Sequence, residues 1–293
     1  MLPLLLEAMR PKQWAKNGVV FAALIFDVQL FQPTPLLRTL AGFGLMCLLS
    51  SAVYLVNDLA DLEKDRQHPQ KRNRPLASGR LSKNVAAAAA VLLPLVALPL
   101  GFLLDWRFGL LALTYLVKDL LYSLWLKHVA IIDVMLVALG FLLRVGAGVV
   151  IITVARFSPW LYICMGLLAL FMGFGKRRAE LALMDSQAGD TRTVLKEYSL
   201  PFLDEMINLV STSTIIAYSL YTFSAPNLPE NHTMMLTIPF VLYSLLRYLY
   251  LIHMKGEGGA PDELVLTDRP LQITFLLWGL SAILIMYLNP QPR

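Results

Sequence analysis

The stretch FGLMCLLSSAVYLVNDLADLEKDRQHPQKRNRP, from Phe43 to Pro75, joins a long apolar run to a dense group of charges. The nineteen residues after Val56 contain four acidic and five basic side chains. A continuous apolar run of this kind is typical of a membrane-spanning helix. The charges that follow this run predict that the helix ends at a membrane surface and that acids and bases act there together.

The whole chain has the composition of an integral membrane protein. It has 293 residues, of which 57% are hydrophobic and 15% charged, and its mean hydropathy is +0.61. In lipid, backbone polar groups must be paired internally, which allows helices or a closed barrel, and continuous apolar runs favour helices. We expect one all-α membrane domain, 1–293, with nine spans at about 17–34, 36–56, 84–104, 108–126, 129–153, 158–175, 205–224, 234–253 and 270–288.

The basic residues predict the orientation of the chain. Eighteen of the 25 Lys and Arg residues lie in the N-terminus and in four connections, 57–83, 127–128, 176–204 and 254–269; four lie on the opposite side and three within spans. The positive-inside rule places the N-terminus and these connections in the cytoplasm and the C-terminus outside. The net charge of +5 therefore requires no nucleic-acid partner.

The acids of this stretch share one helical face. If the second span continues past Val56, then Asn57, Asp58, Asp61 and Asp65 lie at about 0°, 100°, 40° and 80° around its axis. Carboxylates this close repel one another unless a cation lies between them, and Mg²⁺ prefers oxygen ligands and phosphates. The pattern predicts a site for Mg²⁺ and a diphosphate; the alternative is a solvated loop with salt bridges between neighbouring turns.

Three bases follow the acids, namely Lys71, Arg72 and Arg74. Arg suits bidentate contacts with phosphate, and Lys supplies a point charge. Pro75 fixes the exit of the chain just after Arg74. We expect phosphate binding here, against the alternative that these charges only mark the cytoplasmic side.

Nine segments together resemble a known family. The segments RPKQWAKN (10–17), NDLADLEKD (57–65), HPQKRNRPLASG (68–79), YSLWLKHVAIIDV (122–134) and GFLLR (140–144) resemble the UbiA superfamily of intramembrane prenyltransferases. The segments KRRAEL (176–181), VLKEYS (194–199), RYLYL (247–251) and TDRPL (267–271) narrow the resemblance to the branch of decaprenyl-phosphate phosphoribosyltransferases.

The resemblance implies a fold and a reaction. The fold is a nine-helix bundle with a central cavity open to the cytoplasm and laterally to lipid, in a bacterial plasma membrane. The reaction is Mg²⁺-dependent transfer of 5-phosphoribose from phosphoribosyl pyrophosphate to a polyprenyl phosphate, with Mn²⁺ as a possible substitute. Asn57, Asp58, Asp61 and Asp65 match the motif that holds the metal and the diphosphate.

The second acidic motif of the superfamily is altered in this chain. Its region reads KRRAELALMDSQAGD, with Glu180 as one acidic candidate and Asp185 and Asp190 farther along. This departure argues against an ordinary aromatic prenyltransferase. On a helix, Lys176 and Arg177 are i,i+4 and i,i+3 partners of Glu180. The resemblance favours a phosphate clamp of Lys176, Arg177 and Arg178 held by Glu180; the alternative is surface salt bridging, which contributes little.

The fifth predicted span carries charges that are costly to expose to lipid. Asp133, Gly140 and Arg144 fall within about 40° of one another, so we expect them to face a cavity. Asp133 is a candidate catalytic residue that orients the donor sugar. Arg144, together with Lys127 and Tyr122 just upstream, is a candidate for phosphate binding. The alternative is that Asp133 and Arg144 only pair with other helices.

Further candidates are Lys12 and Lys16, which flank Trp14 and either bind phosphate or anchor the interface. Tyr198 is a candidate for reaching the loop site.

In the predicted reaction Mg²⁺ and the bases neutralise the departing pyrophosphate, and the lipid phosphate is already anionic, so no strong base is needed. Two other functions stay open: prenyl transfer to an aromatic acceptor, and non-catalytic lipid binding or transport.

Overall fold

The computed structural model describes residues 1–67, 71–152, 154, 158–184, 193–255, 264–265 and 267–288. Every regular element in these ranges is a helix. The chain forms two compact units. Unit 1 comprises Met1–Leu24, Gln29–Leu136 and Gly140–Val154, and unit 2 comprises Ile25–Val28, Val137–Leu139 and Ala155–Arg293. The expected single domain stays a prediction.

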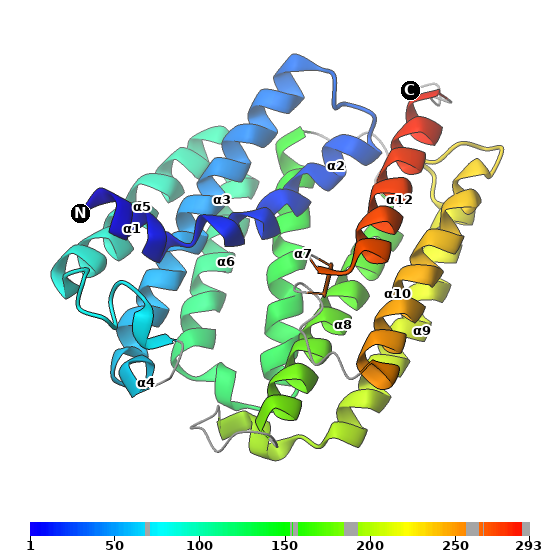
Figure 1. The fold of residues 1–293 in the computed structure, drawn as a ribbon. Coiled ribbons are helices and arrows are strands. Elements are labelled where there is room, and N and C mark those ends of the chain that lie inside the picture. Colours follow the sequence, from blue (N-terminus) through cyan, green and yellow to red (C-terminus); the bar gives the residue numbers. More distant parts are fainter. Residues whose placement is uncertain are drawn as a thin grey trace. The chain divides into compact units, whose positions relative to one another are not determined.

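Unit 1 is built around the long helix α3. This helix packs against α5 and α6 (Figure 1). Met46, Leu49 and Phe108 are fully buried in the core that these helices form. The elements of this part of the chain are α1 (Leu2–Met9), η1 (Pro11–Val20), α2 (Phe21–Phe26), α3 (Pro33–Ala60), α4 (Leu62–Gln67), η2 (Lys71–Asn73), α5 (Lys83–Leu104), α6 (Trp106–Leu124), η3 (Leu126–His128) and α7 (Ile132–Ile152).

Two contacts hold the helices of unit 1 close together. Arg38 on α3 donates to the carbonyl oxygens of Ile151 and Leu104, each at 2.9 Å, and so ties the ends of α7 and α5 to α3. Gly148 on α7 lies against η1, because a Cβ at this position would be 2.1 Å from the carbonyl oxygen of Val20. Only glycine permits this approach of the two backbones.

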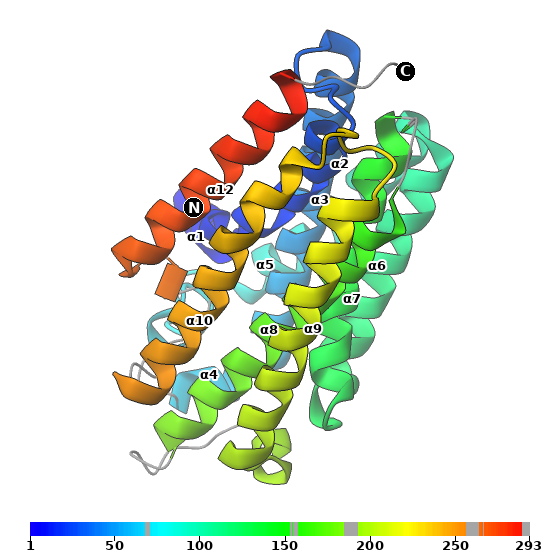
Figure 2. The ribbon, with the colours of Figure 1, turned by 90° about the vertical axis from the view of Figure 1, so that its right-hand side faces the viewer.

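Unit 2 is a set of long helices that lie side by side (Figure 2). Helix α8 packs along α9, and α10 contacts both α9 and α12. The hydroxyl of Ser199 caps α9 by accepting from the amide of Phe202 at 3.3 Å. The elements are α8 (Pro159–Met184), η4 (Thr193–Glu197), α9 (Leu200–Ser224), η5 (Thr233–Thr237), α10 (Ile238–Met254) and α12 (Arg269–Leu288).

The chain is a multi-pass membrane protein with six candidate spans among the described residues. They are Pro33–Ala60, Lys83–Leu104, Ile132–Ile152, Pro159–Ala182, Thr233–Met254 and Arg269–Leu288. The expected spans at 108–126 and 205–224 correspond to the long helices α6 and α9. The count of nine stays a prediction.

The expectation of one continuous helix over about 17–34 is wrong. This segment consists of the end of η1, the short helix α2 and a turn before α3. Asn17 is fully buried and donates to Ser50 at 3.2 Å, which fastens η1 to α3. Asp27 and Gln29 interrupt the apolar run and coincide with the end of α2.

Candidate functional site

The end of α3 presents the acids on successive turns. Helix α3 runs through Ala60, breaks at Asp61, and is followed by α4. The amide of Asp61 donates to Asn57 at 2.9 Å, and the amide of Asp65 donates to Asp61 at 2.8 Å, so the helical path continues through the break. Asp58 and Asp65 are each only 3% exposed, and such buried carboxylates require compensating charge.

Basic side chains from other segments supply that charge. Arg74 Nη1 lies 2.5 Å from Asp65 Oδ2 and 3.3 Å from Asp58 Oδ1, and Arg10 also donates to Asp58 Oδ1. Lys127 Nζ lies 3.0 Å from both carboxylate oxygens of Asp61. We call these six side chains the charge cluster: Arg10, Asp58, Asp61, Asp65, Arg74 and Lys127.

The charge cluster corrects one step of the sequence argument. A shared divalent ion is not required to hold the three carboxylates together, because two guanidinium groups and one ammonium group lie among them. Salt bridges with neighbouring turns do not account for these acids either. Arg66, one of the two bases on α4, pairs instead with the exposed Glu63 at 2.9 Å.

A tightly turned loop fixes Arg74. Its amide donates to Lys71 at 3.0 Å, and its carbonyl accepts from the amide of Ser78 at 2.9 Å. Gly79 has a φ of 76°, a left-handed conformation that favours glycine. This loop carries three of the predicted phosphate ligands. Arg74 contacts the acids, Lys71 is half-buried, and Arg72 is exposed.

Arg144 belongs to a second, buried polar cluster of unit 1. It donates to Asn17 Oδ1 at 2.7 Å, to the Tyr115 hydroxyl at 2.8 Å and to the carbonyl of Gly140 at 2.9 Å. Its guanidinium also lies 4.7 Å from the centre of the Tyr115 ring. These contacts join η1, α6 and α7, and they favour the structural alternative for Arg144 over phosphate binding.

The neighbouring Lys118 lies 2.5 Å from Asp119 and donates to the carbonyl of Leu136 at 3.1 Å. Gly140 leaves room for it, because a Cβ there would be 2.8 Å from Lys118 Nζ. Asp133 is fully buried at the start of α7. Its catalytic role stays a prediction.

The other unit 1 candidates lie nearer the surface. Lys12 is exposed, and Lys16 and Tyr122 are half-buried. Trp14, between the two lysines, donates to Ser51 at 3.0 Å. The side chain of Trp14 therefore anchors η1 to α3. For Lys12 and Lys16 both alternatives stay predictions: phosphate binding, or anchoring at the membrane interface.

In unit 2, bases gather where α8 ends and α9 begins. Arg177 is 3% exposed and pairs with Glu180, which confirms the expected pairing one turn apart. Arg178 lies 2.5 Å from Asp204 on α9, a partner that the sequence did not reveal. Lys176 is exposed. The candidates Asp185 and Asp190 lie outside the described residues.

A further ion pair joins α10 to the start of α12. Arg247 Nη2 lies 2.9 Å from Asp268 Oδ2, and Asp268 Oδ1 accepts from the amide of Leu271 at 2.9 Å, which caps α12. The hydrogen bond from Arg247 keeps the pKa of Asp268 below its ordinary value. Tyr198 is buried and stacks on Phe202, with ring centres 6.1 Å apart, so packing accounts for its position.

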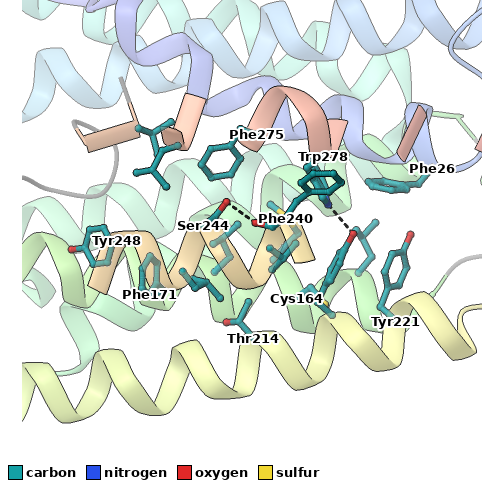
Figure 3. A pocket seen from close by; sticks show the side chains of 18 residues that line it. Phe26, Cys164, Phe171, Thr214, Tyr221, Phe240, Ser244, Tyr248, Phe275 and Trp278 are labelled. Atoms are coloured by element: carbon teal, nitrogen blue, oxygen red, sulfur yellow. Dashed lines mark hydrogen bonds between the residues drawn. The ribbon is translucent and has the colours of Figure 1, made fainter. Parts of the chain in front are cut away.

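An apolar cavity runs between the helices of unit 2 (Figure 3). It holds about 990 Å³ of space, its open side included. The Tyr218 hydroxyl accepts from Trp278 Nε1 at 2.7 Å and bonds to Thr237 at 2.6 Å, so this hydroxyl is already paired. Hydrocarbon and aromatic surface dominates the lining, which includes Leu161, Met165, Leu168, Phe171, Phe240, Leu245, Tyr248 and Phe275.

Two basic residues of unit 2 lie near cavity-lining residues along the same helices. Arg247 immediately precedes Tyr248, which lines the cavity, and Arg177 follows the lining residue Phe171 by six positions on α8. Six residues of helix correspond to about 9 Å. This arrangement suits an amphiphile with an anionic head and a long apolar chain.

Comparison with known proteins defines the class. Residues 18–262 match the model of the UbiA prenyltransferase family, and the chain belongs to this family. It is 33% identical to a decaprenyl-phosphate phosphoribosyltransferase of Corynebacterium glutamicum, over 98% of this chain and 87% of that protein. It is 34% identical to the enzyme of the same name from Mycolicibacterium smegmatis, over 94% of this chain and 89% of that protein.

Solved structures confirm the fold. A UbiA homologue from Archaeoglobus fulgidus, bound to DMAPP and Mg²⁺, superposes with a TM-score of 0.72 at 19% identity and covers 97% of this chain and 99% of that chain. The resemblance that the motifs predicted is thereby confirmed at the level of the family and its fold.

Several site residues were not singled out from the sequence. Arg10 and Asn17 stand at the two ends of RPKQWAKN, and Arg247 and Asp268 lie in RYLYL and TDRPL, so the family segments contained the signal. No sequence signal pointed to Asp204, because its partner Arg178 is 26 positions away on another helix.

Proposed function

We propose that this protein is a Mg²⁺-dependent phosphoribosyltransferase. It transfers 5-phosphoribose from phosphoribosyl pyrophosphate to a decaprenyl-like polyprenyl phosphate and releases pyrophosphate. The observation that carries the proposal is the likeness to decaprenyl-phosphate phosphoribosyltransferases, at 33–34% identity over 93–98% of this chain.

The chemistry of the two units supports this assignment. Both substrates are anionic, and the protein has to bring them together despite their repulsion. Unit 1 offers Arg74 and Lys127 in the charge cluster, with Lys71 and Arg72 beside them. In the proposal these bases, with Lys12, Lys16 and Tyr122 as further candidates, bind the phosphates of the donor.

The oxygen ligands at the end of α3 and on α4 fit Mg²⁺, and Mn²⁺ as a substitute. Asn57, Asp58, Asp61 and Asp65 offer the oxygen ligands that hard divalent ions prefer. Among the described residues, no three acidic, His or Cys side chains are already gathered to hold a metal, because the bases occupy the carboxylates. The bound ion would neutralise charge on the departing pyrophosphate.

The remaining residues position the ribose of the donor and the phosphate of the acceptor lipid. In the proposed reaction the bond from the anomeric carbon to pyrophosphate breaks as an oxygen of the lipid phosphate bonds to that carbon, which gains oxocarbenium character. Asp133 orients the ribose. Arg177, Arg178 and Glu180, with Lys176 and Tyr198 as further candidates, bind the lipid phosphate. Arg144 was predicted to bind phosphate, and its contacts favour a structural role instead.

The apolar cavity of unit 2 is the proposed site of the isoprenoid chain. Its open side lets a chain longer than the cavity continue into lipid. We place the protein in a bacterial plasma membrane with the N-terminus and active site cytoplasmic and the C-terminus outside, on the distribution of its basic residues.

Two turnover assays separate the candidate functions. Purified protein is incubated with Mg²⁺, phosphoribosyl pyrophosphate and a polyprenyl phosphate, and pyrophosphate release is followed. The proposal expects release that requires the lipid and stops with EDTA. Product from a prenyl diphosphate and an aromatic acid would indicate a prenyltransferase instead. Absence of turnover in both assays would favour lipid binding or transport.

A further inference from the structure

The junction of α1 and η1 brings one guanidinium to the charge cluster that the proposed mechanism has not used. Arg10 donates to Asp58 Oδ1, an oxygen that also accepts from Arg74 at 3.3 Å. Arg74 alone already links Asp58 to Asp65. Arg10 is therefore a second base on an acid that has one.

Exposure distinguishes Arg10 from the acid that it contacts. Its side chain is 28% exposed, whereas that of Asp58 is 3% exposed. The guanidinium lies over the Tyr54 ring, 4.9 Å from its centre, which fixes the plane of the group. A guanidinium has five N–H donors, so an Arg10 held in this way has donors left for an incoming anion.

The backbone at Arg10 is strained in order to place this side chain. Its φ of 55° and ψ of 63° are left-handed, a conformation at helix ends that usually belongs to Gly or Asn. The flanking residues are fixed, because Met9 is buried and its carbonyl accepts from Ser51 at 3.2 Å. An arginine kept in an unfavourable conformation beside a site is a reason to look for a function.

Charge balance indicates what that function is. The charge cluster contains three acids and three bases, so it is neutral as it stands. If these acids held a divalent ion, its two positive charges would compete with the bases for the carboxylate oxygens. The donor's diphosphate brings the anions that the displaced bases require, and arginine binds phosphate in a bidentate manner.

We propose that Arg10 is a donor-binding residue that exchanges partners: it holds Asp58 in the free protein and a phosphate of the donor in the complex. The inference rests on the proposed function for the identity of the donor. It assigns a role to the start of RPKQWAKN, where only Lys12 and Lys16 were expected to bind phosphate.

The test uses Arg10→Ala and Arg10→Lys in the full-length protein, with Arg66→Ala as the matched control. Arg66 also pairs with an acid of the same region, but with the exposed Glu63. Mn²⁺ binding is measured alone by electron paramagnetic resonance, and the affinity for pyrophosphate is then measured by calorimetry with Mn²⁺ present. Turnover with the full donor is measured separately.

Exchange predicts opposite changes in the two affinities. Arg10→Ala should bind Mn²⁺ severalfold more tightly, because a competing cation is gone, and bind pyrophosphate about ten- to hundredfold more weakly. Arg10→Lys, which keeps the charge but not the bidentate group, should fall between. Arg66→Ala should match the wild type in both measurements.

An unchanged pyrophosphate affinity in Arg10→Ala would overturn the inference, as would weaker Mn²⁺ binding, which indicates a purely structural counter-ion. If Arg10→Ala does not fold, Arg10→Lys decides, because wild-type pyrophosphate affinity in that variant contradicts the need for a bidentate group. If the binding changes occur but phosphoribosyl pyrophosphate is not turned over by the wild type, the proposed reaction fails and the partner exchange of Arg10 stands.

Discussion

The two units place their charges in different ways. In unit 1 the ions converge, because three acids at the end of α3 and on α4 receive bases from three other segments. In unit 2 the ion pairs instead join helices two at a time: Arg178 links α8 to α9, and Arg247 links α10 to the start of α12. Converging charges suit a polyanion that must be exchanged, and separate pairs suit a stable wall around an apolar chain.

The strongest test of this comparison removes one carboxylate from the charge cluster. Asp61→Asn should reduce pyrophosphate release by about 10²- to 10³-fold, which is typical when one group that stabilises the transition-state charge is lost. The fold should survive, since Asp61 is partly exposed and, within the described part of the chain, its side chain forms an ion pair with Lys127 alone. Initial rates at saturating substrates, with circular dichroism as a check on folding, measure the effect.

Glu63→Gln is the matched control, because Glu63 lies in the same NDLADLEKD segment but pairs outside the charge cluster with Arg66. It should retain the wild-type rate within about twofold, as expected of an exposed pair. Wild-type turnover in Asp61→Asn, or an equal loss in Glu63→Gln, would refute the metal-binding role.

A smaller effect is expected for Arg74→Ala. Its guanidinium joins two acids, and in the proposal it also binds the donor. The KM for phosphoribosyl pyrophosphate should rise by about ten- to hundredfold, with little change in the KM for the lipid. Equal loss for both substrates would count against its assignment and would blur the distinction between the two units.

The matching test in unit 2 fills part of the apolar cavity with a larger side chain. Leu168→Trp adds bulk to its lining and should raise the KM for the polyprenyl phosphate by about tenfold, without changing the KM for the donor. Leu276→Trp adds the same bulk on α12, at a residue that is 62% exposed, and should have no effect. If Leu168→Trp leaves the lipid KM unchanged, the chain does not occupy this cavity.

The sequence predicted what depends on neighbours along the chain. The apolar run placed a span at about 36–56, close to the observed Pro33–Ala60, and the spacing of Arg177 and Glu180 predicted their pairing one turn apart. Periodicity and the i,i+3 relation are local, so one sequence suffices to read them.

What the sequence could not predict depends on pairing at a distance. Arg10 meets Asp58 across 48 positions, Lys127 meets Asp61 across 66, and Arg144 meets Asn17 across 127. Without those partners, the crowded acids suggested a metal ion as the first explanation. Long-range bonds of Asn17 likewise hold the start of the segment 17–34 against α3 and α7.

The smallest expected effect concerns the ion pair between Arg247 and Asp268. Asp268→Asn keeps a good helix cap for α12 but removes the charge, so the variant should unfold at a slightly lower temperature at pH 7. Because the folded pKa of Asp268 lies below its ordinary value of 3.8, the pair stabilises the protein above that pH and loses its effect as the pH falls through the folded pKa. The difference in Tm between wild type and variant should therefore be constant near neutrality and close below about pH 4. A difference that persists undiminished in acid, measured in the same detergent, would show that the charge of Asp268 does not fasten α12 to α10.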